Sequence, residues 1–162
     1  MTAAAKLMPE LKLIPGFALD LTTVEERGRP WNFDQKVMRD EALRRVREEK
    51  PLLLIGSPMC TAFSTWQRIN DKIRDSAVCA AEKARAVEHL KFSVRLYREQ
   101  LRNGRYFLHE HPAATTSWKL PVVTQFRARY PHLYAVTMNM CQFGMATPNS
   151  RGKLTPAKKP TR

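Results

Sequence analysis

The chain has 162 residues, of which 43% are hydrophobic, 27% charged and 9% aromatic. This length allows roughly 70% of the unfolded surface to be buried around one core, so it argues against a two-domain enzyme, and the composition argues against disorder or a fibrous repeat. Twenty-eight Lys and Arg against fifteen Asp and Glu give a net charge of +13, which predicts a surface that binds a polyanion such as nucleic acid.

The sequence shows no sign of a membrane segment or of secretion. No apolar run approaches the roughly 20 residues of a membrane span, and residues 1–11 lack the pattern of a signal peptide. We therefore expect an intracellular protein, cytoplasmic or nuclear, without a membrane partner. The three cysteines form no CxxC pair, so neither a disulfide framework nor a zinc site is predicted.

Apolar periodicity predicts strands that alternate with helices. The predicted strands are 17–21, 52–55, 106–108 and 133–138, and the predicted helices are 36–49, 76–103 and 122–130. The strand at 52–55 is apolar throughout, as expected for a strand covered on both faces, and Gly104 is expected to cap the long helix. The alternation predicts an α/β fold, a Rossmann-like three-layer sandwich with a mostly parallel sheet, truncated at the N-terminus. We expect one domain over 1–145 and a basic C-terminal arm, loop or disordered, over 146–162.

Ligands of such sheets bind beyond the carboxyl ends of the strands, so the chemistry is expected in residues 57–66, 109–118 and 139–150. Cys60 follows the apolar strand directly. A helix start near Phe63 or Ser64 would favour its thiolate and make it a nucleophile. The alternative is a small buried side chain, which is the commonest fate of a lone cysteine.

The next strand leads into His109-Glu110-His111-Pro112. Alternation along a strand points Glu110 one way and both histidines the other. Glu110 is either an acid or hydrogen-bond donor beside the thiol, or a carboxylate satisfied by backbone amides. The two histidines could bind a metal, but no nearby Cys or Asp completes the set, so we expect no metal. The zinc-deaminase pattern is excluded, because the order is reversed and the second Cys is absent.

The segment after Glu110 contains no acidic residue and eight basic ones. Lys158, Lys159 and Arg162 are expected to contact phosphates, and ordinary solvation of a basic tail is the alternative. Ser64 and Arg68, which follow Cys60, are expected to contribute to the same nucleic-acid surface.

Together these strand-end segments resemble the cytosine-5 DNA methyltransferases over roughly residues 17–162. Ser57-Pro58-Met59-Cys60-Thr61-Ala62-Phe63-Ser64 is similar to the family's Pro-Cys loop, and His109-Glu110-His111-Pro112 to its Glu-Asn motif. Cys141-Gln142-Phe143-Gly144, with the later Lys159-Pro160-Thr161-Arg162, is similar to a segment of the phage-type members. Closely similar stretches also resemble domains of mobile-element polyproteins.

The resemblance implies a transferase in which Cys60 adds to cytosine carbon 6 while Glu110 holds the N3 edge of a flipped base. The methyl donor would be S-adenosylmethionine. By the same resemblance, Asp20, Asn32, Asp34, Ser57 and Pro58 would form its site. The family's Gly-rich loop has no counterpart before residue 17, so the domain is expected to be incomplete or inactive alone, and a second chain could complete the cofactor site.

Two alternatives remain. The first is a non-catalytic nucleic-acid-binding module of a mobile-element protein. The second is a thiol-dependent enzyme that acts on small molecules.

Overall fold

The computed structural model describes residues 7, 9–71, 73–157 and 159–162. The chain divides into two compact units, Met1–Leu52 and Leu53–Arg162, which we call unit 1 and unit 2. No helix in the described part of the chain combines the length and the apolar character that a membrane crossing requires.

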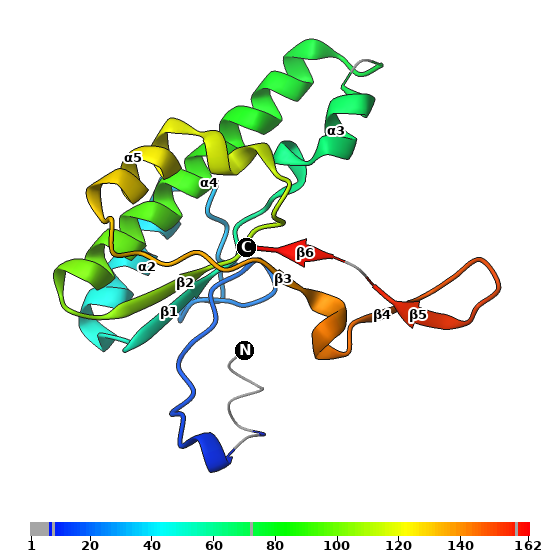
Figure 1. Cartoon of the computed structure of the whole chain (residues 1–162). Helices are drawn as coiled ribbons and strands as arrows, with labels where there is room; N and C mark the ends of the chain where they lie inside the picture. The colour runs from blue at the N-terminus through cyan, green and yellow to red at the C-terminus, as the bar shows by residue number, and fades with distance from the viewer. Residues whose placement is uncertain (1–6, 8, 72, 158) are drawn as a thin grey trace. The chain divides into compact units, whose positions relative to one another are not determined.

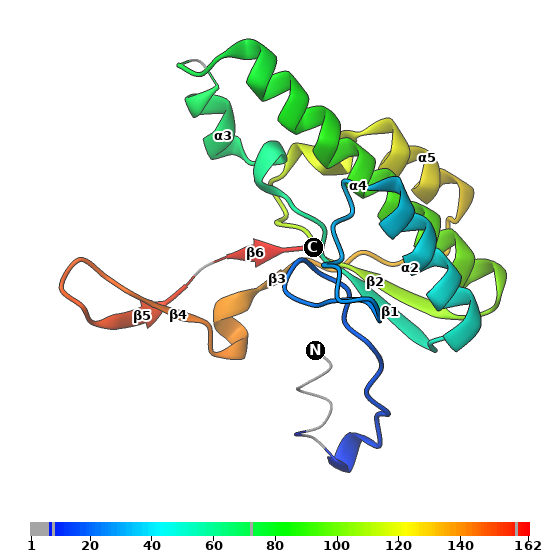
Figure 2. The same cartoon turned by 180° about the vertical axis from the view of Figure 1, so that it is seen from behind.

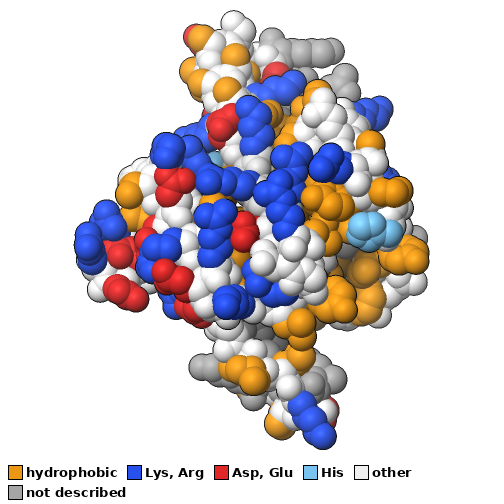
Figure 3. Space-filling model, turned by 90° about the vertical axis from the view of Figure 1, so that its left-hand side faces the viewer, with side chains coloured by type: hydrophobic (Ala, Val, Ile, Leu, Met, Phe, Trp, Pro, Cys, Tyr) orange, Lys and Arg blue, Asp and Glu red, His pale blue; other side chains and the backbone are white. Residues whose placement is uncertain are grey.

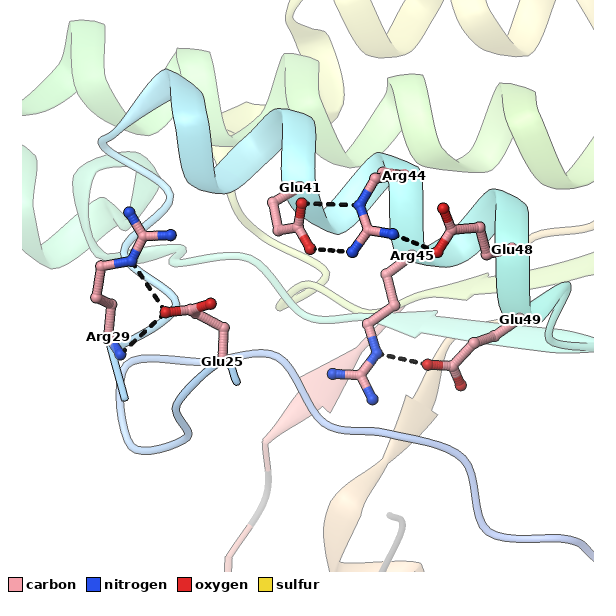
Figure 4. Close-up of polar contacts among 7 residues, drawn as sticks. All are labelled: Glu25, Arg29, Glu41, Arg44, Arg45, Glu48 and Glu49. Carbon is pink, nitrogen blue, oxygen red and sulfur yellow. Dashed lines mark hydrogen bonds and ion pairs between the residues drawn. The ribbon is translucent and has the colours of Figure 1, made fainter. Parts of the chain in front are cut away.

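Unit 1 contains a short 3-10 helix, η1 (Pro9–Leu11), and helix α2 (Lys36–Glu49), which has the predicted bounds. The buried residues of α2 recur every three or four positions, as an amphipathic helix requires. They are Met38, Ala42, Leu43 and Val46. Ion pairs lie along the helix surface, where Arg44 binds Glu41 and Glu48 and Arg45 binds Glu49 (Figure 4). The prediction of this helix is confirmed.

The strand predicted at 17–21 does not form. The Asp20 carboxylate instead accepts hydrogen bonds from the backbone and the hydroxyl of Thr22, both at 2.6 Å. The Phe17 ring packs under the Arg45 guanidinium, 4.5 Å from its centroid. The short Asp and Thr side chains satisfy the backbone locally in a turn, in place of a strand ladder.

Unit 2 is built on a parallel pair, β1 (Leu53–Gly56) and β2 (Tyr106–His109), with Leu53 opposite Tyr106 and Gly56 opposite His109. The crossover between them contains η2 (Thr61–Phe63), α3 (Thr65–Asn70) and the long helix α4 (Ser76–Arg102). Asp75 caps α4 by accepting from the backbone of Ala77 and Val78, and Gly104 follows the helix at φ +65°. The predictions of β1, β2, α4 and its glycine cap are confirmed, with strand ends shifted by about one residue.

The core of unit 2 lies between this pair and two helices, α4 and α5 (Pro121–Arg129) (Figures 1 and 2). Val94, Tyr97 and Phe126 are buried there, and Leu54 and Phe107 pack against them. The alternate residues of both strands remain exposed, so the prediction that the first apolar strand is covered on both faces is wrong. These exposed residues are Leu53, Ile55, Tyr106 and Leu108.

Beyond α5 the chain forms short antiparallel pairs. The strand predicted at 133–138 is reduced to β3 (Met138–Asn139), which pairs with β6 (Pro160–Thr161). β4 (Ala146–Pro148) pairs with β5 (Leu154–Pro156) as a hairpin. Of two further 3-10 helices, η3 (Thr116–Lys119) lies between β2 and α5, and η4 (Met140–Phe143) follows β3. The expectation of a loop or disordered arm over 146–162 is therefore wrong for its described residues.

The predicted Rossmann-like three-layer sandwich with a mostly parallel sheet is wrong. Each sheet among the described residues has two strands, and two of the three sheets are antiparallel. Only β1 and β2 pair in parallel, because residues 17–21 satisfy their backbone in a turn and 133–137 run without a strand partner. Without those two strands no larger parallel sheet can form.

Candidate functional site

The segments that follow β1 and β2 lie side by side, as parallel pairing requires. The Glu110 amide donates to the Gly56 carbonyl at 3.0 Å, which continues the ladder by one residue. Beyond it, the Ser57 hydroxyl donates to Glu110 Oε2 at 2.8 Å, and His111 Nε2 donates to the Pro58 carbonyl at 2.9 Å. The cysteine loop and the His-Glu-His segment are therefore joined by three hydrogen bonds.

Cys60 is a half-buried free thiol at the start of η2. Its loop is anchored on both sides of the cysteine. Pro58 is bound by His111, and Phe63, only 1% exposed, has its ring centroid 6.3 Å from that of His111. Phe63 is thus a core residue, and Cys60 lies in the loop between these two anchors.

Glu110 accepts hydrogen bonds from two hydroxyls, one on each carboxylate oxygen. Ser57 donates to Oε2 and Thr161 donates to Oε1. Partial burial acts to raise the pKa of Glu110, but the hydrogen bonds from Thr161 and Ser57, with the charge of Lys159, outweigh it and hold that pKa below its usual value. Glu110 is therefore an ionised acceptor at neutral pH, held by hydroxyls where the sequence analysis considered backbone amides.

The C-terminal strand β6 brings Thr161 to this carboxylate. His111 and Arg162 exchange both backbone hydrogen bonds, at 3.0 and 2.8 Å, and the Ala113 amide donates to the Pro160 carbonyl. Thr161 is 3% exposed, and its hydroxyl also donates to the His111 carbonyl at 3.1 Å. Sequence reasoning missed Thr161, because a hydroxyl among basic residues gives no local signal of a partner 51 residues away.

The two histidine rings lie beside each other, with ring centroids 4.8 Å apart. His111 Nε2 must carry its proton, because the Pro58 carbonyl can only accept, so Nδ1 accepts from the Ser117 hydroxyl at 2.8 Å. His109 Nδ1 bonds the Tyr97 hydroxyl at 2.8 Å.

Burial lowers the pKa of both rings, that of His109 to about 4. His111 therefore acts as a neutral anchor of the cysteine loop. Among the described residues, no group of three or more His, Cys, Asp or Glu side chains is placed to hold a metal ion.

The predicted nucleic-acid contacts fall into three groups. The Arg162 guanidinium lies 5.5 Å from the centroid of the Trp118 ring, and Lys159 is exposed but close enough to Glu110 to lower its pKa. Ser64 has a local role, since its hydroxyl accepts from the Gln67 amide at 3.4 Å in the first turn of α3. Lys158 and the side chain of Arg68 lie outside the described residues.

The residues expected to bind S-adenosylmethionine make local hydrogen bonds in this structure. Asp20 lies in a turn, where Thr22 donates two hydrogen bonds to one of its carboxylate oxygens, and Asn32 Oδ1 accepts from the Asp34 amide at 3.0 Å. In unit 2, Ser57 and Pro58 are engaged by Glu110 and His111. We therefore derive no methyl-transfer step from this chain.

The positive charge is concentrated in unit 2. Unit 1 has ten Lys and Arg against nine Asp and Glu, whereas unit 2 has eighteen against six, a net charge of +12. Lys and Arg side chains are numerous on the face shown in Figure 3. The unit that contains Cys60 and Glu110 is thus the one suited to a polyanion.

Comparison with models of protein families, with curated proteins and with solved structures found no match, so the interpretation of these residues rests on their geometry and chemistry.

Proposed function

We propose that unit 2 binds nucleic acid and holds a cytosine base against Glu110, with Cys60 as the nucleophile, as the cytosine-5 methyltransferases do. The observation that carries this proposal is the pair of hydrogen bonds from Ser57 to Glu110 and from His111 to Pro58. They tie the loop of a half-buried thiol to the segment of an ionised carboxylate at one end of a parallel strand pair.

Glu110 retains capacity for a base edge. An ionised carboxylate offers about four lone-pair sites, and the hydroxyls of Ser57 and Thr161 use two of them. The remaining two can accept from the exocyclic amine of cytosine and from N3 once that atom is protonated. The low pKa of Glu110 favours this acceptor role.

The reaction that these residues support is reversible addition to the base. The Cys60 thiolate forms a bond from Sγ to carbon 6, the 5,6 double bond becomes a 4,5 double bond, and the electron pair of the 3,4 double bond moves to N3, which takes a proton from water and donates it in a hydrogen bond to Glu110. Carbon 5 then takes a proton from a second water while N3 returns its proton to hydroxide and the 3,4 double bond re-forms. Loss of the other carbon 5 hydrogen to hydroxide and of the thiolate from carbon 6 restores cytosine, so the net result is exchange of that hydrogen with solvent.

Hydrogen exchange tests this proposal without any methyl donor. DNA labelled with tritium at cytosine carbon 5 should release the label into water when incubated with the full chain. Cys60→Ser should abolish the release while DNA affinity is kept, and Glu110→Gln should slow it by about 10²-fold. Cys141→Ser, which removes another half-buried free thiol, is the matched control and should release label at the wild-type rate.

No release by the wild-type protein under conditions where DNA is bound would contradict the catalytic part of the proposal. It would favour the second candidate function, a non-catalytic nucleic-acid-binding module of a mobile-element protein. Asp20 and Asn32 accept hydrogen bonds within their own turns, which favours this candidate. The net charge of +12 on unit 2 favours it as well.

A further inference from the structure

We infer that the β4–β5 hairpin, residues 146–156, which we call the arm, grips double-stranded nucleic acid in its major groove through Arg151 and Lys153 at its tip. The inference rests on the proposed function. It specifies that the nucleic acid is double-stranded and that the arm is the element that binds it. The arm departs from the body of unit 2 between β3 and β6, and in Figures 1 and 2 it extends away from the helices of that unit.

The tip of the arm is an ordered turn that presents basic side chains. Asn149 Oδ1 accepts from the amides of Arg151 and Lys153 at 2.9 and 3.0 Å. The Asn149 and Gly152 amides close the turn by donating to the Lys153 and Asn149 carbonyls, and Gly152 takes a φ of +74°. Arg151 and Lys153 are exposed, and the sequence has no acidic residue after Glu110 that could neutralise them locally.

The strands of the arm are largely exposed on both faces. Every residue of β4 and β5 is exposed except Thr155, whose hydroxyl donates to the Thr147 carbonyl across the hairpin at 3.2 Å. Pro148 and Pro156 remove backbone donors from the strands, which disfavours pairing of their edges with a second copy of the chain. The arm is therefore built as a free ribbon.

A duplex fits this ribbon in shape and in charge. The major groove of B-form DNA, about 12 Å wide, admits a two-stranded β-ribbon, and phosphates line both of its sides. The arm also adjoins the base site, because β6 follows it and delivers Thr161 to Glu110. A base that leaves a duplex for Glu110 requires the rest of that duplex to be held nearby, and the arm is placed to do so.

Apolar side chains at the root of the arm suit the same partner. Phe143, at the end of η4, is 69% exposed, and Met145 and Leu154 are also exposed. Base edges and sugars offer apolar contacts beside phosphates. An anionic membrane surface also offers phosphates beside apolar groups, so lipid vesicles are tested separately.

The test compares the full chain with Arg151→Ala/Lys153→Ala by fluorescence anisotropy on a labelled duplex and on its single strand, at salt concentrations of about 50 to 200 mM. The slope of log affinity against log salt is negative, and each lost phosphate contact should make it less steep by about 0.9 on the duplex, so we expect the slope to become less negative by about 2 for the pair. Affinity for the single strand should change much less. Arg27→Ala/Arg47→Ala removes two exposed charges from unit 1 and should leave the duplex slope unchanged.

An unchanged duplex slope in the arm variant, or an equal loss on the single strand, would overturn the inference. A loss seen only on phosphatidylglycerol vesicles would overturn it too, and would assign the arm to a membrane surface. If the wild-type protein binds neither form of nucleic acid, the proposed function itself fails. Urea midpoints of both variants equal to that of the wild type would show that folding is unaffected.

Discussion

The bond from Thr161 to Glu110 is the single side-chain contact that most directly sets the charge state of the candidate site. Thr161→Val keeps the shape of a 3% exposed side chain and removes the hydroxyl that donates to Glu110 and to the His111 carbonyl. We expect the pKa of Glu110 to rise and the free energy of unfolding at pH 7 to fall by about 2 kcal/mol, since the lost bond has a charged acceptor. Carboxyl NMR titration and urea denaturation measure the two effects.

The sign of the pH dependence follows from the low pKa of Glu110 in the folded state. The stabilisation is complete above the ordinary pKa of glutamate and is lost as pH falls through the lower folded value. The difference between wild type and Thr161→Val should therefore shrink with acid over that window. Thr155→Val removes a hydroxyl bonded to a neutral carbonyl in the arm and should cost less, with no such pH dependence. A constant difference for Thr161→Val down to low pH would contradict this account.

The sequence predicted the candidate site residues but not the hydrogen bonds that hold them in place. Cys60 and Glu110 stand out because each follows an apolar strand, and the structure places the rings of His109 and His111 beside each other. The bond from His111 to Pro58 and the bond from Thr161 to Glu110 join residues 53 and 51 positions apart. No local pattern encodes such a pairing, so these two supports could be found only in the folded structure.

Among the elements, β1 and α4 approach each other closely at Gly56. A Cβ on Gly56 would collide with the Tyr97 hydroxyl and lie 2.9 Å from Tyr97 Cζ. Gly56→Ala should therefore cost about 1–3 kcal/mol of stability. In a Tyr97→Phe background the same change should cost less, because the nearest atom is gone, although Tyr97→Phe itself leaves His109 Nδ1 without its partner.

Urea denaturation of the two single variants and the double variant measures this coupling. Gly16→Ala is the matched control, because nothing lies within 4 Å of a Cβ there, and it should be close to neutral. Additive costs for Gly56→Ala and Tyr97→Phe would show that the helix shifts away from the strand without relieving a specific contact.

Elements with a strong local pattern were predictable, and those defined by distant pairing were not. α2 and α4 follow from their apolar period and, for α4, from its cap at Asp75. Residues 17–21 have the composition of a strand, but Asp20 and Thr22 satisfy the backbone in a turn. The arm is the reverse case, because its Pro, Gly and Asn residues suggested a loop, whereas Asn149 orders the tip of a hairpin.

For the molecule as a whole, the local hydrogen bonds of the expected cofactor residues predict whether the chain binds S-adenosylmethionine. Asp20 and Asn32 in unit 1 accept hydrogen bonds within their own turns, and the Ser57 hydroxyl in unit 2 donates to Glu110. Calorimetric titration of the full chain with S-adenosylmethionine should therefore give no saturable heat, with or without a duplex. Saturable binding at micromolar concentrations would contradict this prediction and would support a methyl-donor site.

The long separation of paired segments in unit 2 also determines the order in which the candidate site can assemble. The backbone hydrogen bonds of α4 join residues close in sequence, so this helix can form early, whereas β1 must wait for β2, and Glu110 must wait for Thr161, 51 residues later. On the ribosome, the carboxylate therefore remains without its second hydroxyl until Thr161 has been synthesised and has emerged. A newly made chain thus acquires its helices before it acquires a complete site.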